Sequence, residues 1–179
     1  MYGRLLEALN LPPGVVNLVQ GGGDIGAHLS AHPALKGLCF TGSWATGRRI
    51  LEATLDQPWK MVALEMGGRN AAIVLEDADL PQAVHEVVIG ACLTAGQRCT
   101  ATSRVLVHAD LEERFVAGLV AAFANISPGD PLLDETLMGP LATEKSFESF
   151  MGKMEWLETT SVETLVSSRA PGGGAFVTP

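Results

Sequence analysis

A cysteine that follows a glycine turn is the residue of this sequence best suited to attack an electrophilic carbon. It lies in the segment Gly96-Gln97-Arg98-Cys99-Thr100, which we expect to continue helically before the next strand. A thiol near a helix N-terminus or beside a cation ionises more readily, and the thiolate is the nucleophile. The alternative is a small cysteine buried in the core, which we favour for Cys39 and Cys92.

A glutamate at the end of a predicted strand is the second candidate. The segment Leu64-Glu65-Met66-Gly67-Gly68 places this carboxylate just before a double-glycine turn. Functional residues gather at strand ends in α/β folds, and a glutamate there can act as a general base. The alternative is an ordinary carboxylate exposed to solvent.

A glycine-serine turn between a predicted strand and a predicted helix is suited to holding a phosphate. The segment Phe40-Thr41-Gly42-Ser43 is followed by a further glycine, Gly47. Backbone amides at a helix N-terminus attract an anion, and glycine lets a ligand approach the backbone closely. The other interpretation is that the Ser43 hydroxyl only caps the helix. Neither this turn nor Gly21-Gly22-Gly23 is the G-x-G-x-x-G fingerprint of a dinucleotide site.

The elements that must position these residues alternate between helix and strand. We predict helices over residues 3–10, 24–31 with Asp24 as N-cap, 44–55, 79–95, 110–125 and about 141–158. We predict strands over residues 15–19, 35–41, 61–65, 71–75 and 104–108, and strand and loop from 159 to 179. This alternation is typical of an α/β fold with mainly parallel strands.

The composition narrows the class of protein. The chain has 179 residues, of which 47% are hydrophobic, and a net charge of −8 (12 − 20), which predicts a globular protein with a substantial core. The negative charge disfavours a nucleic-acid partner or an anionic membrane, and no apolar stretch is long enough to predict a membrane span. Three scattered cysteines predict neither disulfides nor a metal site and favour a reducing, cytoplasmic setting.

Taken in order, the three motifs resemble the aldehyde dehydrogenase superfamily, nearly continuously from Leu11 to about Leu141. The glycine-serine turn with Gly47 is similar to the family's coenzyme-binding turn, and the segments around Glu65 and Cys99 match its glutamate and cysteine motifs. Glu65 and Cys99 lie 34 positions apart (99 − 65), the usual separation in the family. Residues 12–17, 129–131 and 138–141 also match family landmarks.

The resemblance implies a fold, a chemistry and a cofactor. Residues 1–66 would be the second half of a Rossmann-like coenzyme domain, and residues 67–179 the first part of an α/β catalytic domain. Cys99 would attack an aldehyde to form a thiohemiacetal and then a thioester, and Glu65 would activate the water that hydrolyses it. The whole enzyme would be a homo-oligomer. The residues expected to lie against NAD, or NADP, are Gly42, Ser43, Gly47, Met66 and Gly67.

Two stretches resemble one branch of that family. Residues 57–68 and 94–100 are most similar to enzymes that act on N-succinylglutamate 5-semialdehyde in arginine catabolism. Arg69 and Ser103 depart from that branch, which tends to have asparagine and arginine there. The alternatives are an enzyme for α-aminoadipic semialdehyde, one of broad specificity, or a catalytically incompetent member. The family's oxyanion asparagine and its glutamate-x-phenylalanine motif have no counterpart among these 179 residues, so we expect the chain by itself to be inactive.

Overall fold

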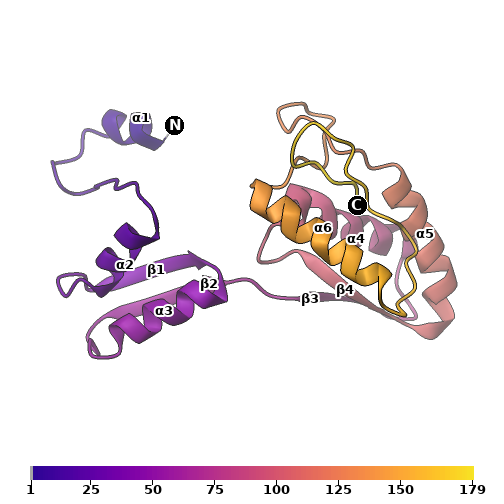
Figure 1. Cartoon of the computed structure of the whole chain (residues 1–179), viewed down its shortest axis with the longest axis horizontal. Helices are drawn as coiled ribbons and strands as arrows, with labels where there is room; N and C mark the ends of the chain where they lie inside the picture. The colour runs from indigo at the N-terminus through magenta and orange to yellow at the C-terminus, as the bar shows by residue number, and fades with distance from the viewer. Residues whose placement is uncertain (1) are drawn as a thin grey trace. The chain divides into compact units, whose positions relative to one another are not determined.

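The computed structural model describes residues 2–179, and the chain divides into two compact units, Met1–Met66 and Gly67–Pro179. Each unit holds its own two-stranded parallel sheet, with helices from the same unit packed beside it (Figure 1). The α/β character predicted from the alternating pattern is therefore present in both units.

The first unit is a strand-helix-strand arrangement with two helices before it. Its elements are α1 (Tyr2–Ala8), α2 (Gly23–Ala31), β1 (Gly37–Gly42), α3 (Trp44–Thr54) and β2 (Met61–Met66). β1 and β2 pair in parallel, and α3 connects them. α3 buries Gly47, Ile50 and Thr54, whose spacing places them on one face of a helix. Ile50 is the only large hydrophobic side chain buried within the described part of this unit.

A buried lysine joins the end of α2 to the start of β2. Lys60 is 7% exposed, and its Nζ donates to the backbone oxygens of Ser30 at 2.7 Å and His32 at 3.0 Å. The last carbonyl groups of a helix have no partner within the helix, and a cation is favourable there. Lys60 therefore stabilises the C-terminal end of α2 and fixes that end next to β2.

The second unit has a larger core. Its elements are β3 (Asn70–Val74), α4 (Leu80–Cys92), the 3-10 helix η1 (Leu93–Gly96), β4 (Thr102–Val107), the 3-10 helix η2 (Ala109–Leu111), α5 (Glu112–Ala124) and α6 (Glu144–Glu158). Val74 of β3, Val87 of α4 and Phe115 of α5 meet in one buried cluster, where Phe115 is 1% exposed. A second cluster joins Cys92 to Leu141 and Val177, so the C-terminal segment packs against the residues around α6.

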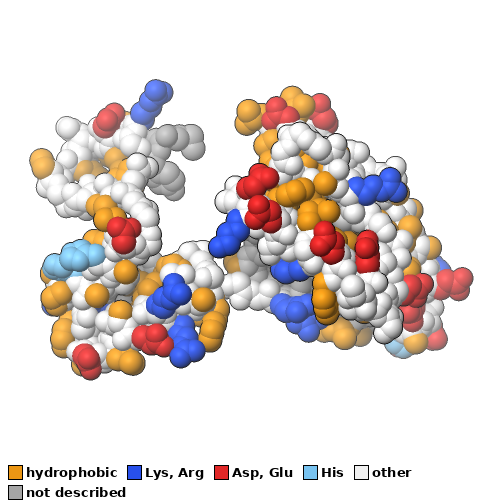
Figure 2. Space-filling view, in the orientation of Figure 1, with side chains coloured by type: hydrophobic (Ala, Val, Ile, Leu, Met, Phe, Trp, Pro, Cys, Tyr) orange, Lys and Arg blue, Asp and Glu red, His pale blue; other side chains and the backbone are white. Residues whose placement is uncertain are grey.

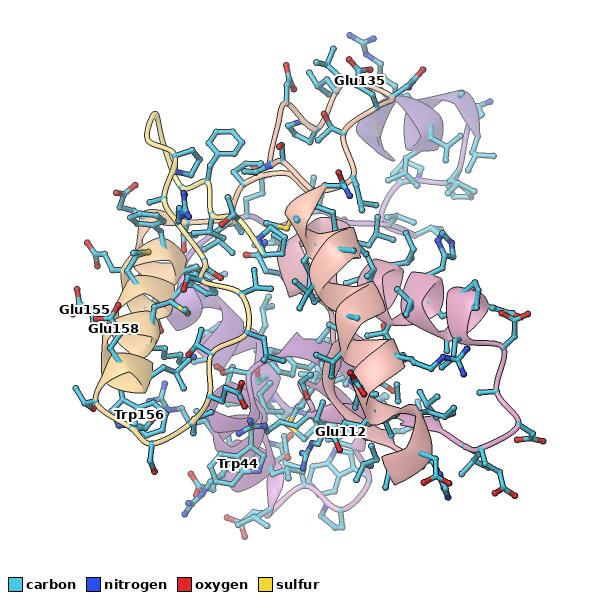
Figure 3. All side chains as sticks on the ribbon, turned by 90° about the vertical axis from the view of Figure 1, so that its right-hand side faces the viewer. Trp44, Glu112, Glu135, Glu155, Trp156 and Glu158 are labelled. Atoms are coloured by element: carbon cyan, nitrogen blue, oxygen red, sulfur yellow. The ribbon has the colours of Figure 1, made fainter. Side chains whose placement is uncertain are left out.

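Helix caps explain where several elements begin. The Asp79 side chain accepts from the backbone N–H of Gln82 at 3.1 Å, and α4 starts at the next residue. Thr143 caps α6 in the same way through the N–H of Ser146. The last turn of α6 holds three exposed side chains, Glu155, Trp156 and Glu158 (Figure 3).

Three predictions about local structure are wrong. Residues 15–19 and the tail from 159 to 179 form no strand, because β-branched residues need a neighbouring strand to pair with, and these segments have none. The N-cap of α2 is Gly22, and Asp24 lies within the first turn of the helix. Residues 97–100 do not continue helically: η1 ends at Gly96 and a turn follows.

Hydrophobic side chains remain exposed on the first unit. Leu18 is 78% exposed and Leu55 75%, and Figure 2 shows hydrophobic side chains over the surface of this unit. A unit of this size with so few buried apolar side chains gains little free energy from folding. Among the described residues, no helix combines the length and the apolar character required to cross a membrane.

Candidate functional site

The carboxyl ends of β1 and β2 bring four predicted site residues together: Gly42, Ser43, Glu65 and Met66. In the parallel register, Thr41 lies opposite Glu65 and Gly42 lies opposite Met66. Glu65 is exposed to solvent, so its carboxylate is available to react. Ser43 follows Gly42 directly and begins α3: its Oγ accepts from the N–H of Thr46 at 3.2 Å. The Ser43 hydroxyl is thus the helix cap that the sequence allowed as one of two interpretations.

Gly47 and Met66, two residues predicted to lie against a cofactor, touch each other. A Cβ atom added to Gly47 would lie 2.5 Å from Met66 Sδ and 3.6 Å from Leu64 Cδ1. α3 therefore packs closely on β2 because residue 47 has no side chain. Gly47 has a packing role here that the sequence motif did not reveal.

A cavity of about 550 Å³ lies between α2, α3 and β1. Its lining is mainly apolar, and it includes Gly23 and Gly26 of α2 and Thr46 and Arg49 of α3. A Cβ atom built on Gly23 or Gly26 would meet nothing within 4 Å, so the α2 backbone is open to a ligand. Binding sites for small molecules commonly have this volume and character.

Cys39 lies on the wall of this cavity and is exposed, although its position in an apolar strand predicted burial. The residues of α2 and α3 that line the cavity were also missed. Thr46 and Arg49 are three positions apart on a predicted helix, immediately after the glycine-serine turn. That spacing is the signal that could have identified them.

Cys99 lies in an exposed turn between η1 and β4. The backbone before it is unusual: Thr94 and Ala95 have φ values of 57° and 51°, and Gly96 has 67°. Left-handed backbone costs roughly 1–2 kcal/mol for a residue with a side chain, and such conformations cluster at functional sites. No helix begins at Cys99, so the helix N-terminus that the sequence predicted beside the thiol is absent from this turn.

Side chains on both sides of the turn hold it in place. Asn70 Nδ2 donates to the Cys99 carbonyl oxygen at 2.7 Å and to the Ala101 carbonyl oxygen at 3.1 Å. The Gln97 side chain accepts from the N–H of Ala142 at 2.9 Å and donates to the Thr94 carbonyl oxygen at 3.1 Å. Asn70 was not identified from the sequence, although it stands just after the predicted double-glycine turn.

The remaining thiol, Cys92, is unsuited to attack. It is 3% exposed, and burial raises the pKa of its thiol above the ordinary value of 9.0, because a buried thiolate loses its hydration. Cys99 is therefore the exposed thiol of the second unit, and Cys39 that of the first.

No group of three or more His, Cys, Asp or Glu side chains is placed to hold a metal ion among residues 2–179. In the same range, no hydrogen bond joins a histidine to Cys99. His108 contacts Asp110 instead.

Some of the predicted site residues belong to the first unit and the others to the second. Glu65 belongs to the first unit and Cys99 to the second. The cofactor residues in the first unit are Gly42, Ser43, Gly47 and Met66, and Gly67 is the first residue of the second.

Comparison of the sequence with known proteins gives a consistent set of relatives. The sequence model of the aldehyde dehydrogenase family matches residues 1–179. The chain is 40% identical to N-succinylglutamate 5-semialdehyde dehydrogenase of Escherichia coli, over 98% of this chain and 36% of that protein. It is 38% identical to hydroxyisobutyraldehyde dehydrogenase of Mycolicibacterium austroafricanum, over 99% of this chain and 36% of that protein. The chain thus spans about 36% of the length of these relatives.

Solved structures give the same result for the fold. Betaine aldehyde dehydrogenase of Staphylococcus aureus, in complex with NAD+, superposes with a TM-score of 0.91 at 29% identity, over 99% of this chain and 36% of that chain. An NAD-dependent benzaldehyde dehydrogenase of Corynebacterium glutamicum superposes with a TM-score of 0.88 at 36% identity, over 98% of this chain and 38% of that chain. The fold is therefore the α/β fold of these dehydrogenases.

Proposed function

Because this chain belongs to the aldehyde dehydrogenase family, we propose that it carries the nucleophile and the general base of an enzyme that oxidises aldehydes to carboxylic acids. The observation that carries the proposal is the exposed Cys99 turn in the family's cysteine motif, 34 positions (99 − 65) after an exposed Glu65 at a strand end. We also propose a cofactor, NAD, and a class of substrate, the semialdehydes, for the whole protein.

Each residue has one task in this mechanism. The Cys99 thiolate attacks the aldehyde carbon, a C–S bond forms, and the carbonyl oxygen becomes an oxyanion held partly by the backbone N–H of Cys99. Loss of hydride from that carbon leaves a thioester on Cys99. Glu65 then removes a proton from water, the water oxygen attacks the thioester, and the C–S bond breaks to release the acid and the thiolate.

We propose that NAD binds to the first unit. When bound, NAD supplies the acceptor for the hydride. We propose that the Ser43 turn lies near the pyrophosphate, because backbone N–H groups at the start of α3 attract an anion. Thr46 Oγ1 lies 3.0 Å from Ser43 Oγ, within hydrogen-bond distance, and Thr46 also lines the cavity between α2 and α3. Thr46 thus borders both the turn and the cavity, and we propose that the mainly apolar cavity takes an apolar, flat part of the cofactor. NAD rather than NADP is our choice because the two solved relatives described above are associated with NAD.

A bulky residue placed in the cavity tests this assignment. We expect Gly26→Leu to weaken NAD binding by the 179-residue chain about tenfold or more, a loss of roughly 1.4 kcal/mol, measured by isothermal titration calorimetry. Gly152→Leu is the matched control, because Gly152 also lies in a helix with nothing within 4 Å of a built Cβ, but it does not line the cavity. Equal NAD affinity in the two variants would place the cofactor elsewhere.

We propose a semialdehyde as the substrate, with N-succinylglutamate 5-semialdehyde as the first to test. Identity of 40% to an enzyme of that name supports the choice. The similar match to hydroxyisobutyraldehyde dehydrogenase keeps other aldehydes in the test panel. Arg69 and Ser103 depart from the semialdehyde branch: Arg69 directly precedes β3, and Ser103 is the second residue of β4.

The experiment that tests the mechanism uses a chimera in which this chain replaces the matching segment of the Escherichia coli relative. We expect aldehyde-dependent NAD reduction by the chimera, little from the 179-residue chain alone, and loss of at least about a thousandfold in kcat for Cys99→Ala. NAD binding should survive in that variant, which shows that it is folded. Full activity without the Cys99 thiol would rule out the nucleophile assignment.

A glutamate variant separates the two halves of the reaction. We expect Glu65→Gln to keep a first, rapid burst of product from acylation of Cys99 and then to turn over slowly, because the amide cannot take a proton from water. Rapid-mixing kinetics measure the burst and the later rate separately. Glu76→Gln is the matched control, since Glu76 is an exposed carboxylate that follows β3 in the other sheet. A slow second phase in both variants would contradict a specific role for Glu65.

A further inference from the structure

A single side-chain amide binds the backbone on both sides of Thr100. Asn70 Nδ2 contacts the carbonyl oxygens of Cys99, at 2.7 Å, and Ala101, at 3.1 Å. Both partners are acceptors, so the NH₂ side of the amide must face them, which fixes the orientation of the group. The Asn70 amide therefore binds the backbone at both ends of the segment 99–101. One of its two partners is the carbonyl group of Cys99 itself.

Asn70 is in turn held by an irregularity in the β3–β4 pair. Asn70 lies opposite Thr102 and Ala71 opposite Arg104, so Ser103 is an extra residue in β4. Ser103 Oγ donates to the Asn70 carbonyl oxygen at 3.1 Å. Bulges of this kind redirect side chains and are common beside active sites. The backbone of Asn70 is thus fixed at the start of the sheet, and its side chain is a firm support for the loop.

We propose that Asn70 is a positioning residue for Cys99, an inference that rests on the proposed role of Cys99 as nucleophile. The Cα that carries the thiol is bonded to the carbonyl that Asn70 holds, so the amide restricts where Sγ and the N–H of Cys99 point. Both attack on the aldehyde and stabilisation of the oxyanion depend on those two directions. Misplacement of reacting atoms by about 1 Å can cost on the order of a hundredfold in rate.

Two asparagine variants and a matched control test this inference. Asn70→Ala removes the amide, and Asn70→Asp keeps its shape but removes the hydrogen-bond donors when ionised. Asn125→Ala is the control: Asn125 Nδ2 donates to one backbone oxygen, that of Ala121, at 2.8 Å, at the end of α5. The control loses a hydrogen bond of the same kind in the same unit, away from the Cys99 turn.

The first readout is kinetic and uses the chimera. We expect both Asn70 variants to lower kcat about tenfold or more, while Asn125→Ala keeps the parent value. The Kd for NAD and the rate at which iodoacetamide alkylates Cys99 should change by less than about twofold in all three, because neither needs the thiol in one orientation. Loss of kcat shared equally by Asn70→Ala and Asn125→Ala would contradict the inference.

The second readout needs no dehydrogenase activity. In the 179-residue chain with Cys39→Ser, Cys99 is the exposed thiol that takes a trifluoroacetonyl label. We expect the fluorine-19 signal of the label in both Asn70 variants to move toward its position in the urea-unfolded chain, and to stay at the parent position in Asn125→Ala. Unchanged spectra in the Asn70 variants would overturn the positioning role. An active Cys99→Ala variant would instead overturn the proposed function, and the fluorine signal would still report on the loop.

Discussion

At the scale of single residues, the three cysteines differ in what their surroundings allow. Cys39 and Cys99 are exposed, whereas Cys92 is buried with Met138 and Leu141. We therefore expect iodoacetamide to modify Cys39 and Cys99 in the folded chain and Cys92 only after unfolding, as measured by peptide mass spectrometry. Early modification of Cys92 would show that its cluster opens readily.

The raised pKa of Cys92 also predicts a pH dependence of stability. The unfolded thiol ionises near 9.0, while burial keeps the folded thiol protonated to higher pH. Above 9.0 the unfolded state thus holds fewer protons than the folded state, so the free energy of unfolding falls as pH rises. Urea unfolding from pH 8 to 10 measures this slope, which should be shallower in Cys92→Ala. Parallel slopes in the two proteins would contradict it.

At the scale of elements, the position of α2 depends on Lys60. Lys60→Met leaves the buried Ser30 carbonyl without its partner, which costs about 1–3 kcal/mol. We expect the free energy of unfolding of the first unit to fall by that amount in urea titrations, and Lys60→Arg to restore part of it. Lys36→Met is the control, because Lys36 is exposed. An equal loss from both methionine substitutions would show that the buried hydrogen bonds contribute nothing.

The sequence predicts an element well where its own residues determine it. Helices α3, α4 and α5 carry an apolar face and, for α3 and α4, a cap at Ser43 and Asp79, so they lie close to their predicted ranges. Cys99 and Glu65 could be proposed as site residues from the sequence because each lies in a contiguous motif. Asn70 could not, because its partners Cys99 and Ala101 lie 29 and 31 positions away. The left-handed backbone at Thr94 and Ala95 could not be predicted either, because neither position holds a glycine or asparagine, the residues that favour this conformation.

At the scale of the whole molecule, the two units should lose structure separately. Each sheet is built from strands of one unit, and Ile50 is the one large hydrophobic side chain buried among the described residues of the first unit. We expect the amides of β1 and β2 to lose protection from hydrogen exchange at lower urea than those of β3 and β4. Lys60→Met should lower the urea concentration at which β1 and β2 lose protection and leave that of β3 and β4 unchanged. A single shared transition would show that the units fold as one.

The placement of both strand pairs has a consequence for the order of synthesis. Every residue that β1 needs in order to pair lies at or before Met66, so this pair is complete on the chain before the ribosome adds Cys99. Asn70 is synthesised 29 residues before Cys99, so its hydrogen bond to the Cys99 carbonyl oxygen can form only after that later segment has emerged from the ribosome. Since chains fold from the N-terminus as they are made, the β1–β2 pair with Glu65 leaves the ribosome before the β3–β4 pair and the Cys99 turn.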